Sequence, residues 1–373
     1  MIYFDNAATT KYKPDSVIEA LMYYLTNIGV SPGRGSYSLG IEASRMLYKS
    51  RVTVGKYFGM SKPERVIFTK NSTESINLLF NGILSKGDHV IISCYEHNAV
   101  LRPLHRLKQD GIIDYSIISR DDLLLSPEAL FNKYSKDNTR LLALTLASNL
   151  TGRIIYRSDW VGYFHDRNII TFVDSSQGAG KLSLNMCSNK IDFLAFTGHK
   201  DLYSVPGIGG LCCESEIHFN PLVQGGTGIH GETYVNPDVF PEGYEAGTLN
   251  MPAIWALKAG IDYIESNKDM INNIEKELMS YLLQKLRCIK GIKIYDIEND
   301  RVPTCCFTLD DLSTDKTVAL LDSGSISVRG GIHCAILAHE ALNTVQTGAV
   351  RISLNYRNTK EEIDQLINII KSR

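Results

Sequence analysis

Short apolar segments alternate with helical patterns over residues 66–213, and this alternation constrains the fold more than any other feature of the sequence. Several of the segments are apolar throughout, as expected for strands that are covered on both faces. Strands alternating with helices in this way favour a mainly parallel sheet with helices on both sides, an α/β fold. The predicted strands are 66–69, 89–93, 141–147, 169–173, 193–196 and 208–213. The predicted helices are 14–28, 41–58, 73–84, 100–109, 127–133 and 159–165.

The pattern changes near residue 250. Long helical patterns and shorter strand candidates follow, and a last helix is predicted to begin at Thr359 with a capping box that includes Glu362. We therefore expect a large domain over 13–250 and a smaller α+β domain made of 1–12 and 251–373. The predicted helices of this second part are 252–266 and 269–285, and its predicted strands are 293–295, 304–308, 325–329 and 350–353.

Composition narrows the class of protein. The formal net charge of −2 is far from the basic excess of proteins that coat nucleic acid, so we expect no nucleic-acid partner. The longest unbroken apolar run, about 141–144, is far shorter than the roughly 20 residues of a membrane span, and no secretory signal is visible. The eight cysteines include no C-x-x-C pair and are expected mostly as small buried side chains. These features predict a cytoplasmic protein with no membrane partner.

A lysine follows one of the predicted strands. Lys200 ends the sequence TGHK (197–200), directly after the apolar segment 193–196. In open α/β sheets the ligand lies beyond the carboxyl ends of the strands, so Lys200 is expected at a ligand site. A partly buried lysine there can form a Schiff base, because burial lowers its pKa. Taken alone, Lys200 could equally be a surface lysine.

Polar side chains follow the other predicted strands as well. This set suits pyridoxal phosphate, which needs a lysine, a carboxylate for its pyridine nitrogen, a donor at the ring oxygen, a planar group over the ring and hydroxyls for its phosphate. Thr73 also opens a helix, whose N-terminus favours an anion. Each residue alone could be a helix cap or an ordinary loop residue, but their joint occurrence favours the cofactor. The residues are Thr73, His97, Asn149, Asp174, Gln177 and Thr197.

Eight short motifs, spread nearly from end to end, carry a resemblance to a known family. They are FDNAATT (4–10), NSTE (71–74), EHNAVLRPL (96–104), SNLTG (148–152), VDSSQ (173–177), FTGHK (196–200), EAGTLN (245–250) and RGGIHCA (329–335). With them the chain resembles the cysteine desulfurases, pyridoxal-phosphate enzymes of the class V aminotransferase-like group. The last motif is similar to that of the second, selenocysteine-lyase-like subgroup. The resemblance implies transferase fold type I, with a mainly parallel seven-stranded-type sheet and a smaller α+β C-terminal domain.

The resemblance also implies roles for individual residues at the cofactor. Lys200 would form the Schiff base and later move the substrate's α-proton, Asp174 would pair with the pyridine nitrogen, and Gln177 would bond the ring oxygen. His97 would stack on the ring and take part in proton transfer, beside Asn149. The residues implied near the phosphate are Thr73, Glu74, Thr197, His199 and, reaching across from a second subunit of a homodimer, Thr248.

Further residues are implied at the substrate. Arg351 matches the arginine that grips the substrate carboxylate, a task that suits its bidentate fork. Asn6 and Arg34 are expected nearby. Cys334 matches the nucleophile whose thiolate attacks the sulfur of L-cysteine, leaving L-alanine and a persulfide for an acceptor protein. A cationic neighbour, Arg329 or His333, would lower the pKa of this thiol; without the motif, a buried structural cysteine would be the simpler interpretation.

Two other activities stay open besides the desulfurase. One keeps pyridoxal phosphate but acts as a selenocysteine lyase, another β-lyase or an aminotransferase. The other is a sulfur-relay protein that is inactive without its carrier partner. It is motivated by Tyr203-Ser-Val-Pro206, where the family usually has Leu-Gly-Pro or Tyr-Gly-Pro. The sequence does not name the sulfur acceptor.

Other cofactors find little support. The glycine-rich segments 207–210 and 225–228 do not give G-x-G-x-x-G after a first strand, so no dinucleotide site is expected. The histidines lack metal-ligand spacing such as H-E-x-x-H, so no metal site is expected either.

Overall fold

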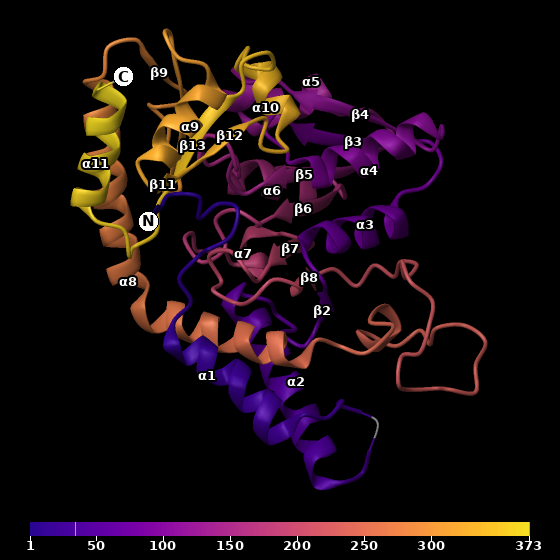
Figure 1. Cartoon of the computed structure of the whole chain (residues 1–373). Helices are drawn as coiled ribbons and strands as arrows, with labels where there is room; N and C mark the ends of the chain where they lie inside the picture. Colours follow the sequence, from indigo (N-terminus) through magenta and orange to yellow (C-terminus); the bar gives the residue numbers. More distant parts are fainter. Residues whose placement is uncertain (34, 373) are drawn as a thin grey trace.

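A seven-stranded sheet forms the centre of the computed structural model, which describes residues 1–33 and 35–372 (Figure 1). Its strands lie in the order β2-β8-β7-β6-β5-β3-β4, and β8 is antiparallel to both of its neighbours, whereas the others run parallel. The predicted mainly parallel sheet is therefore confirmed. The strands are β2 Val66–Thr69, β3 Asp88–Ser93, β4 Ile113–Ile118, β5 Thr139–Thr145, β6 Ile170–Asp174, β7 Phe193–Thr197 and β8 Gly209–Cys213.

Strand β4 is absent from the predicted strands. It lies at the edge of the sheet and pairs only with β3 among the described strands. Its sequence, IDYSII, leaves four of six side chains part-exposed, so it contains no continuous apolar run of the kind that marks the central strands.

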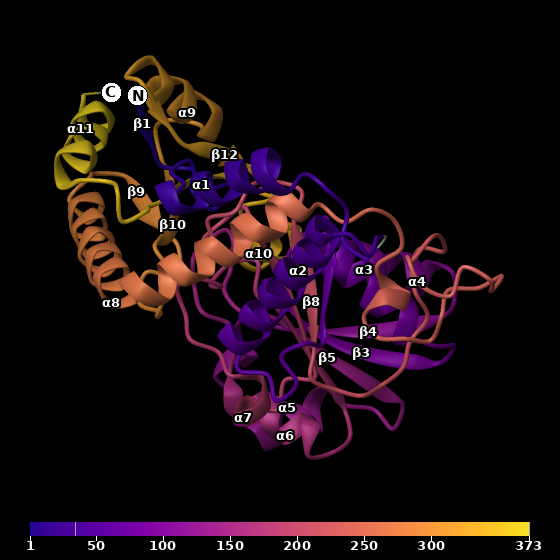
Figure 2. The same ribbon diagram turned by 90° about the horizontal axis from the view of Figure 1, so that it is seen from below.

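Helices cover both faces of this sheet (Figures 1 and 2). Neighbouring strand residues Ile67 and Phe68 point to opposite faces and belong to separate apolar clusters. Helices α3 and α4 complete the cluster of Ile67, and α2, α6 and part of α8 complete the other. The helices before residue 250 are α1 Asp15–Tyr23 with a π-helical turn Tyr24–Ile28, α2 Ser38–Tyr57, α3 Ser72–Ile83, α4 Asn98–Gln109, α5 Pro127–Tyr134, α6 Ser158–His165 and α7 Met186–Asn189. Short 3-10 turns span Asp121–Leu124 and Glu242–Tyr244.

A second, antiparallel sheet has the order β12-β13-β10-β9. The predicted strand 325–329 is divided here, because β11 pairs with the N-terminal β1 while β12 pairs with β13. Both chain ends therefore lie beside this sheet (Figure 2). The elements are β1 Ile2–Tyr3, β9 Ile292–Ile294, β10 Thr304–Leu309, β11 Ile326–Ser327, β12 Arg329–Gly331, β13 Ala349–Ser353, α9 Thr314–Ser323, α10 Ile336–Ala341 and α11 Lys360–Lys371. The capping box of Thr359 and Glu362 is present.

One helix, α8 Met251–Arg287, replaces the two helices predicted at 252–266 and 269–285. The predicted break between these two helices was wrong, because the polar stretch near Asn267 contains neither Gly nor Pro and continues the helix. The helix packs against α1 and α2 and then turns up beside α11 (Figure 1). It thus contacts both expected domains, and the boundary at 250 stays a prediction. None of the helices in the described ranges combines the length and apolar character that a membrane span needs.

Candidate active site

A cavity of about 310 Å³ lies beyond the carboxyl ends of β5, β6 and β7. It brings together side chains that are far apart in the sequence, from Ala7 to Arg351. The predicted site residues among its lining are Thr73, His97, Asn149, Asp174, Gln177, Thr197, His199, Lys200, Cys334 and Arg351. Ser72, Ser176, Arg329 and His333 line it as well.

Lys200 lies on the turn that follows β7. Its carbonyl accepts the Tyr203 amide at 2.9 Å, which closes the turn. Burial lowers the pKa of Lys200 to about 8, and the nearby cation Arg351 acts in the same direction, whereas Asp174 opposes both. A substantial fraction of neutral amine therefore exists near neutral pH, as a nucleophilic lysine requires.

The unusual sequence after Lys200 does not leave this turn loose. Tyr203 is buried with a left-handed φ of +59°. The Ser204 amide donates to the Gly198 carbonyl at 2.9 Å, and its hydroxyl donates to the Ala253 carbonyl at 2.9 Å. Serine thus ties the turn to helix α8.

Asp174, at the end of β6, is buried and held by two serines. Its Oδ1 accepts the Ser72 hydroxyl at 3.2 Å, the Ser176 amide at 3.0 Å and the Ser176 hydroxyl at 2.6 Å. These bonds fix the direction of the carboxyl group. Sequence reasoning assigned no role to Ser72 or Ser176, although both lie inside motifs that it singled out.

The same cavity also offers hydroxyl groups and a helix N-terminus. Thr73 lies in the first turn of α3, and Thr197 ends β7. Thr197 Oγ1 is buried and finds no hydrogen-bond partner in the described part of the chain. Such a group costs about 1–3 kcal/mol, so it points to a polar ligand. These residues fit a phosphate group.

Two histidines in the cavity are neutral. Burial, followed by the charge of Lys200, lowers the pKa of His97 to about 4. His97 Nδ1 accepts the Ala99 amide at 3.0 Å, so the ring hydrogen lies on Nε2. Burial and then Lys200 likewise lower the pKa of His199 to about 4, and its Nδ1 lies 3.1 Å from Thr9 Oγ1. A neutral ring suits stacking on a cofactor.

Arg351 is buried on β13 and is already paired. One guanidinium nitrogen donates to the Asn149 carbonyl at 2.9 Å, and another contacts the Asp5 carboxylate. Its Nε is buried with no partner among the described residues. Asp5 lies in the N-terminal motif but received no role from sequence reasoning. The orientation of Arg351 in the site is thus fixed, and one of its donors, Nε, is unused.

Cys334 lies between β12 and α10, with an exposed thiol that lines the cavity. His333 and Cys334 both have left-handed φ values of +55°, a strained conformation for residues with a Cβ. Two hydrogen bonds hold the segment of His333 and Cys334 to residues that follow strands of the seven-stranded sheet. The side-chain Nδ2 of Asn149 donates to the His333 carbonyl at 2.7 Å, and the backbone amide of Asn98 donates to the Cys334 carbonyl at 2.8 Å.

The predicted cationic help from His333 is wrong. Burial, followed by the nearby Arg351, lowers the pKa of His333 to about 3, so its ring is neutral at physiological pH. Its Nε2 lies 3.1 Å from the Arg329 carbonyl. Arg329 itself lines the cavity and remains the cationic neighbour for the thiol.

Three further predicted residues, Glu74, Thr248 and Asn6, are not among the described residues that line this cavity. Glu74 accepts the Lys70 amide at 2.6 Å and lines a neighbouring cavity of about 420 Å³ together with Thr248. Asn6 donates to the Ser353 carbonyl at 3.1 Å. Arg34 lies outside the described residues. Roles for these residues stay predictions.

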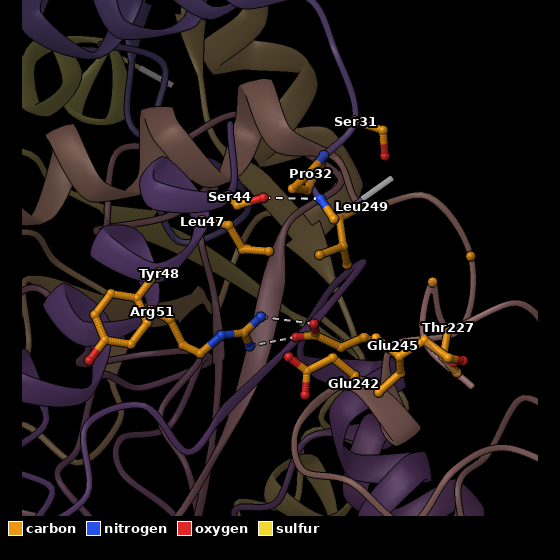
Figure 3. A pocket seen from close by; sticks show the side chains of 14 residues that line it. Ser31, Pro32, Ser44, Leu47, Tyr48, Arg51, Thr227, Glu242, Glu245 and Leu249 are labelled. Atoms are coloured by element: carbon orange, nitrogen blue, oxygen red, sulfur yellow. Dashed lines mark hydrogen bonds and ion pairs between the residues drawn. The ribbon is translucent and has the colours of Figure 1, made fainter. Parts of the chain in front are cut away.

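A buried ion pair anchors the EAGTLN segment that carries Thr248. Arg51, from α2, forms two bonds to the Glu245 carboxylate, at 2.7 and 2.9 Å (Figure 3). The same carboxylate accepts the Phe68 amide at 2.6 Å. Both groups are fully partnered, so the pair reads as support for the segment at the rim of a cavity of about 240 Å³.

Curated proteins similar to this chain share most of its length. A protein named probable cysteine desulfurase, from Methanothermobacter thermautotrophicus, is 32% identical, covering 98% of this chain and 92% of the relative. A protein named cysteine desulfurase, from Yersinia pseudotuberculosis, is 30% identical with the same coverage of both chains.

Solved structures give the same result. The apo structure of a cysteine desulfurase from Thermococcus onnurineus has a TM-score of 0.89 and 31% identity, covering all of this chain and 94% of the other. A cysteine desulfurase from Escherichia coli has a TM-score of 0.87 and 26% identity, covering 99% and 94% of the two chains. The family model of aminotransferase class-V matches residues 2–366. With that match and the relatives above, this chain belongs to the aminotransferase class-V family.

Proposed function

We propose that this chain is a pyridoxal-phosphate-dependent cysteine desulfurase. It converts L-cysteine to L-alanine and leaves the sulfur as a persulfide on Cys334. The observation that carries the proposal is that an accessible thiol, Cys334, and a lysine of lowered pKa, Lys200, line one cavity. The lysine alone would suit many reactions, whereas the thiol supplies an acceptor for sulfur. The similar proteins that bear this name support the same activity.

The cavity residues fit the cofactor. Thr73, Thr197 and His199 would hold its phosphate, and the unpartnered Thr197 hydroxyl supports this assignment. Asp174 would keep the ring nitrogen protonated, with Ser72 steadying the carboxylate. When bound, pyridoxal phosphate supplies the electron sink that no protein side chain provides.

Protein groups orient the substrate and move its protons. Arg351 binds the substrate carboxylate through its unused Nε and the nitrogen now paired with Asp5. Lys200 removes the α-proton and later returns a proton to the carbon that has lost sulfur. His97, with its hydrogen on Nε2, can donate a hydrogen bond into the same space.

Sulfur transfer takes place at Cys334. Its thiolate forms a bond to the substrate sulfur while the carbon–sulfur bond of the substrate breaks, and the released electron pair stays on carbon. Protonation of that carbon completes alanine, so cysteine plus enzyme thiol gives alanine plus enzyme persulfide. Arg329 contributes a positive charge to the same cavity. A thiol of an acceptor protein then takes the terminal sulfur and restores Cys334.

We also propose a cytoplasmic homodimer. Large apolar side chains are exposed on α1 and α2 and in the loop before Thr248, and a second copy would cover them. They include Ile18, Met22, Leu25, Leu39, Tyr48, Leu222, Tyr234 and Val235. Thr248 would then reach the cofactor phosphate of the partner. All eight cysteines are free, which suits a reducing compartment.

The proposal is tested on the purified protein, with and without Cys334→Ala. Its visible absorption is recorded, L-cysteine and a reductant are added, and alanine and sulfide are measured. Wild type should show the cofactor band and form both products in equal amounts. Cys334→Ala should keep the band and lose at least about 10²-fold in kcat. Cys187→Ala, at an exposed cysteine outside the cavity, should behave as wild type.

Other outcomes separate the alternatives. Selenide release from selenocysteine that survives Cys334→Ala would favour a lyase, and activity that appears only with an added acceptor protein would favour a sulfur relay. A protein that shows no band after addition of pyridoxal phosphate would remove Lys200 from the mechanism and end the proposal.

A further inference from the structure

Three buried charged side chains form a cluster outside the cavity: Lys181, Asp201 and Glu275. Their side chains are only 5%, 10% and 3% exposed. Lys181 Nζ lies 3.2 Å from Asp201 Oδ1 and also contacts Glu275 Oε1. The cluster has one amino group and two carboxyl groups, and burial raises the pKa of Glu275 to about 7. None of the three lines the cavity of Lys200. None of these three side chains takes part in the reaction proposed for the cavity.

The chain connects this cluster directly to the reactive groups. Asp201 is the residue after Lys200, and Lys181 lies four residues after Gln177. The two segments also touch through their backbones. A Cβ at Gly180, whose φ is +92°, would lie 2.2 Å from the Asp201 carbonyl oxygen. Only glycine allows the turn before Lys181 to pack this closely on the turn that carries Lys200.

Glu275 ties the same turn to helix α8 and to the strand of Arg351. Its Oε1 accepts the Tyr356 amide at 3.1 Å, five residues after Arg351. A second link runs beside it, because Asn355 Nδ2 donates to the Tyr203 hydroxyl at 3.2 Å. Lys200, proposed to move the proton, and Arg351, proposed to bind the substrate carboxylate, therefore lie in segments that are both held to helix α8.

Buried ion clusters are a poor source of stability, because desolvation offsets the attraction and apolar side chains pack as well. They do impose direction, since each bond has a fixed geometry. Catalytic groups need that precision, and a displacement of about 1 Å can cost 10²-fold in rate. We propose that Lys181, Asp201 and Glu275 are a positioning triad that fixes the Lys200 turn against helix α8 and the Arg351 strand. The inference rests on the proposed role of Lys200.

The charges around Lys200 give the triad a measurable signature. Asp174 and Asp201 favour its protonated form, while Arg351 and Arg329 oppose it. Lys181 balances the charge of Asp201. Without Lys181, the negative charge of Asp201 would raise the pKa of Lys200 more strongly.

The other titratable groups near the triad keep one charge state near neutral pH. Tyr57 stays neutral, because burial raises its pKa to about 12, and burial also raises the pKa of Tyr203. Lys13 lies near Asp201, and its Nζ donates to the His199 carbonyl at 2.8 Å. The exception is Lys13, because burial lowers its pKa to about 8, the same value as for Lys200, so both amines titrate in the same pH range.

The test compares Lys181→Met and Glu275→Gln with Lys360→Met and Glu277→Gln. The control pair, Lys360 with Glu277, is exposed and uses the same helix α8. Hydrogen–deuterium exchange of the Lys200 peptide is measured in the cofactor-free proteins. The pH midpoint of the visible absorption, kcat and KM are measured after loading with pyridoxal phosphate.

Lys181→Met should exchange faster at the Lys200 peptide, move the absorption midpoint to higher pH and lower kcat about 10- to 100-fold with KM little changed. Glu275→Gln should raise exchange and lower kcat less, without the midpoint shift, because Lys181 still pairs with Asp201. Both controls should match wild type.

Folded triad variants with wild-type exchange, midpoint and kcat would overturn the proposal. If Lys181→Met does not fold, Glu275→Gln alone decides through exchange and kcat. A wild type that binds no cofactor would instead defeat the proposed function, whereas a loaded wild type with insensitive variants defeats only the triad.

Discussion

The lysine side and the cysteine side of the cavity are built in opposite ways. Lys200 follows a central strand, and its turn is held by side chains from several elements, including Ser204 and the triad of Lys181, Asp201 and Glu275. Cys334 lies on a short segment between β12 and α10, and its thiol is exposed. That segment is held through its own carbonyl groups, by Asn149 and Asn98.

The difference matches the two tasks. A proton-transferring amine needs a fixed position and an altered pKa, and burial supplies both. A sulfur carrier must meet the substrate inside the cavity and an acceptor outside it. Bonds to the backbone fix where the cysteine segment lies but leave the thiol free to change rotamer. Substitutions at and near the two sides test this difference.

The largest effect is expected from Lys200→Ala. The variant should lose at least about 10³-fold in kcat, since it removes the group proposed to bond the cofactor and move protons. Borohydride reduction and mass spectrometry should find cofactor attached to wild type and Cys334→Ala, but not to Lys200→Ala. If the cofactor were attached to another lysine in Lys200→Ala, the assignment of Lys200 would be wrong, and so would the comparison of the two sides of the cavity.

Asn149→Ala should loosen only the cysteine side. It removes the bond to the His333 carbonyl, worth about 1 kcal/mol, so the segment should open about fivefold more often. The measurement is the rate at which iodoacetamide alkylates Cys334 in the cofactor-free protein. Exposed Cys187 and Cys288 serve as internal controls and should react at unchanged rates. An unchanged Cys334 rate would show that Asn149 does not hold the segment.

Lys200→Met should stabilise the cofactor-free protein in a pH-dependent way. The pKa of Lys200 is about 8 when folded and 10.5 when unfolded, so the unfolded chain holds the extra proton between these values. Wild-type stability therefore rises with pH in this window, and its penalty is complete below about pH 8. Lys200→Met should be more stable by roughly 3 kcal/mol at pH 7, and the gap should close above pH 10.5. Urea unfolding at several pH values measures it; a constant gap would mean that burial does not perturb Lys200.

The smallest effect at low pH is expected for Glu96→Gln, at the residue before His97. This carboxyl group is buried, and burial raises its pKa to about 8, so the folded protein keeps a proton that the unfolded chain loses above its ordinary pKa of 4.5. Wild-type stability should fall as pH rises from 4.5 to 8, whereas Glu96→Gln should lack that slope. The two proteins should differ by less than about 0.5 kcal/mol at pH 4.5. Parallel slopes would indicate that Glu96 is ionised in the folded state.

Sequence reasoning succeeded where the signal is local. Central strands such as 66–69 are continuous apolar runs, and Asp174 and Lys200 follow strands whose ends meet at one edge. It failed where a long-range partner decides. Strand β4 is an edge strand without an apolar run, and α8 continues through the mostly exposed polar stretch 265–270, which contains neither Gly nor Pro. His333 was expected as a cation, but burial keeps it neutral.

The sequence by itself determined the α/β order, the motifs and the residue types at the strand ends, because these depend on short-range periodicity and on chemistry that each side chain carries with it. Only the tertiary structure decided which groups meet. Asp5 reaches Arg351 across the chain, Asn149 reaches the segment of Cys334, and Lys181, Asp201 and Glu275 converge from three segments. The burial that neutralises histidines and lowers the pKa of Lys200 also arises only when distant elements exclude water together.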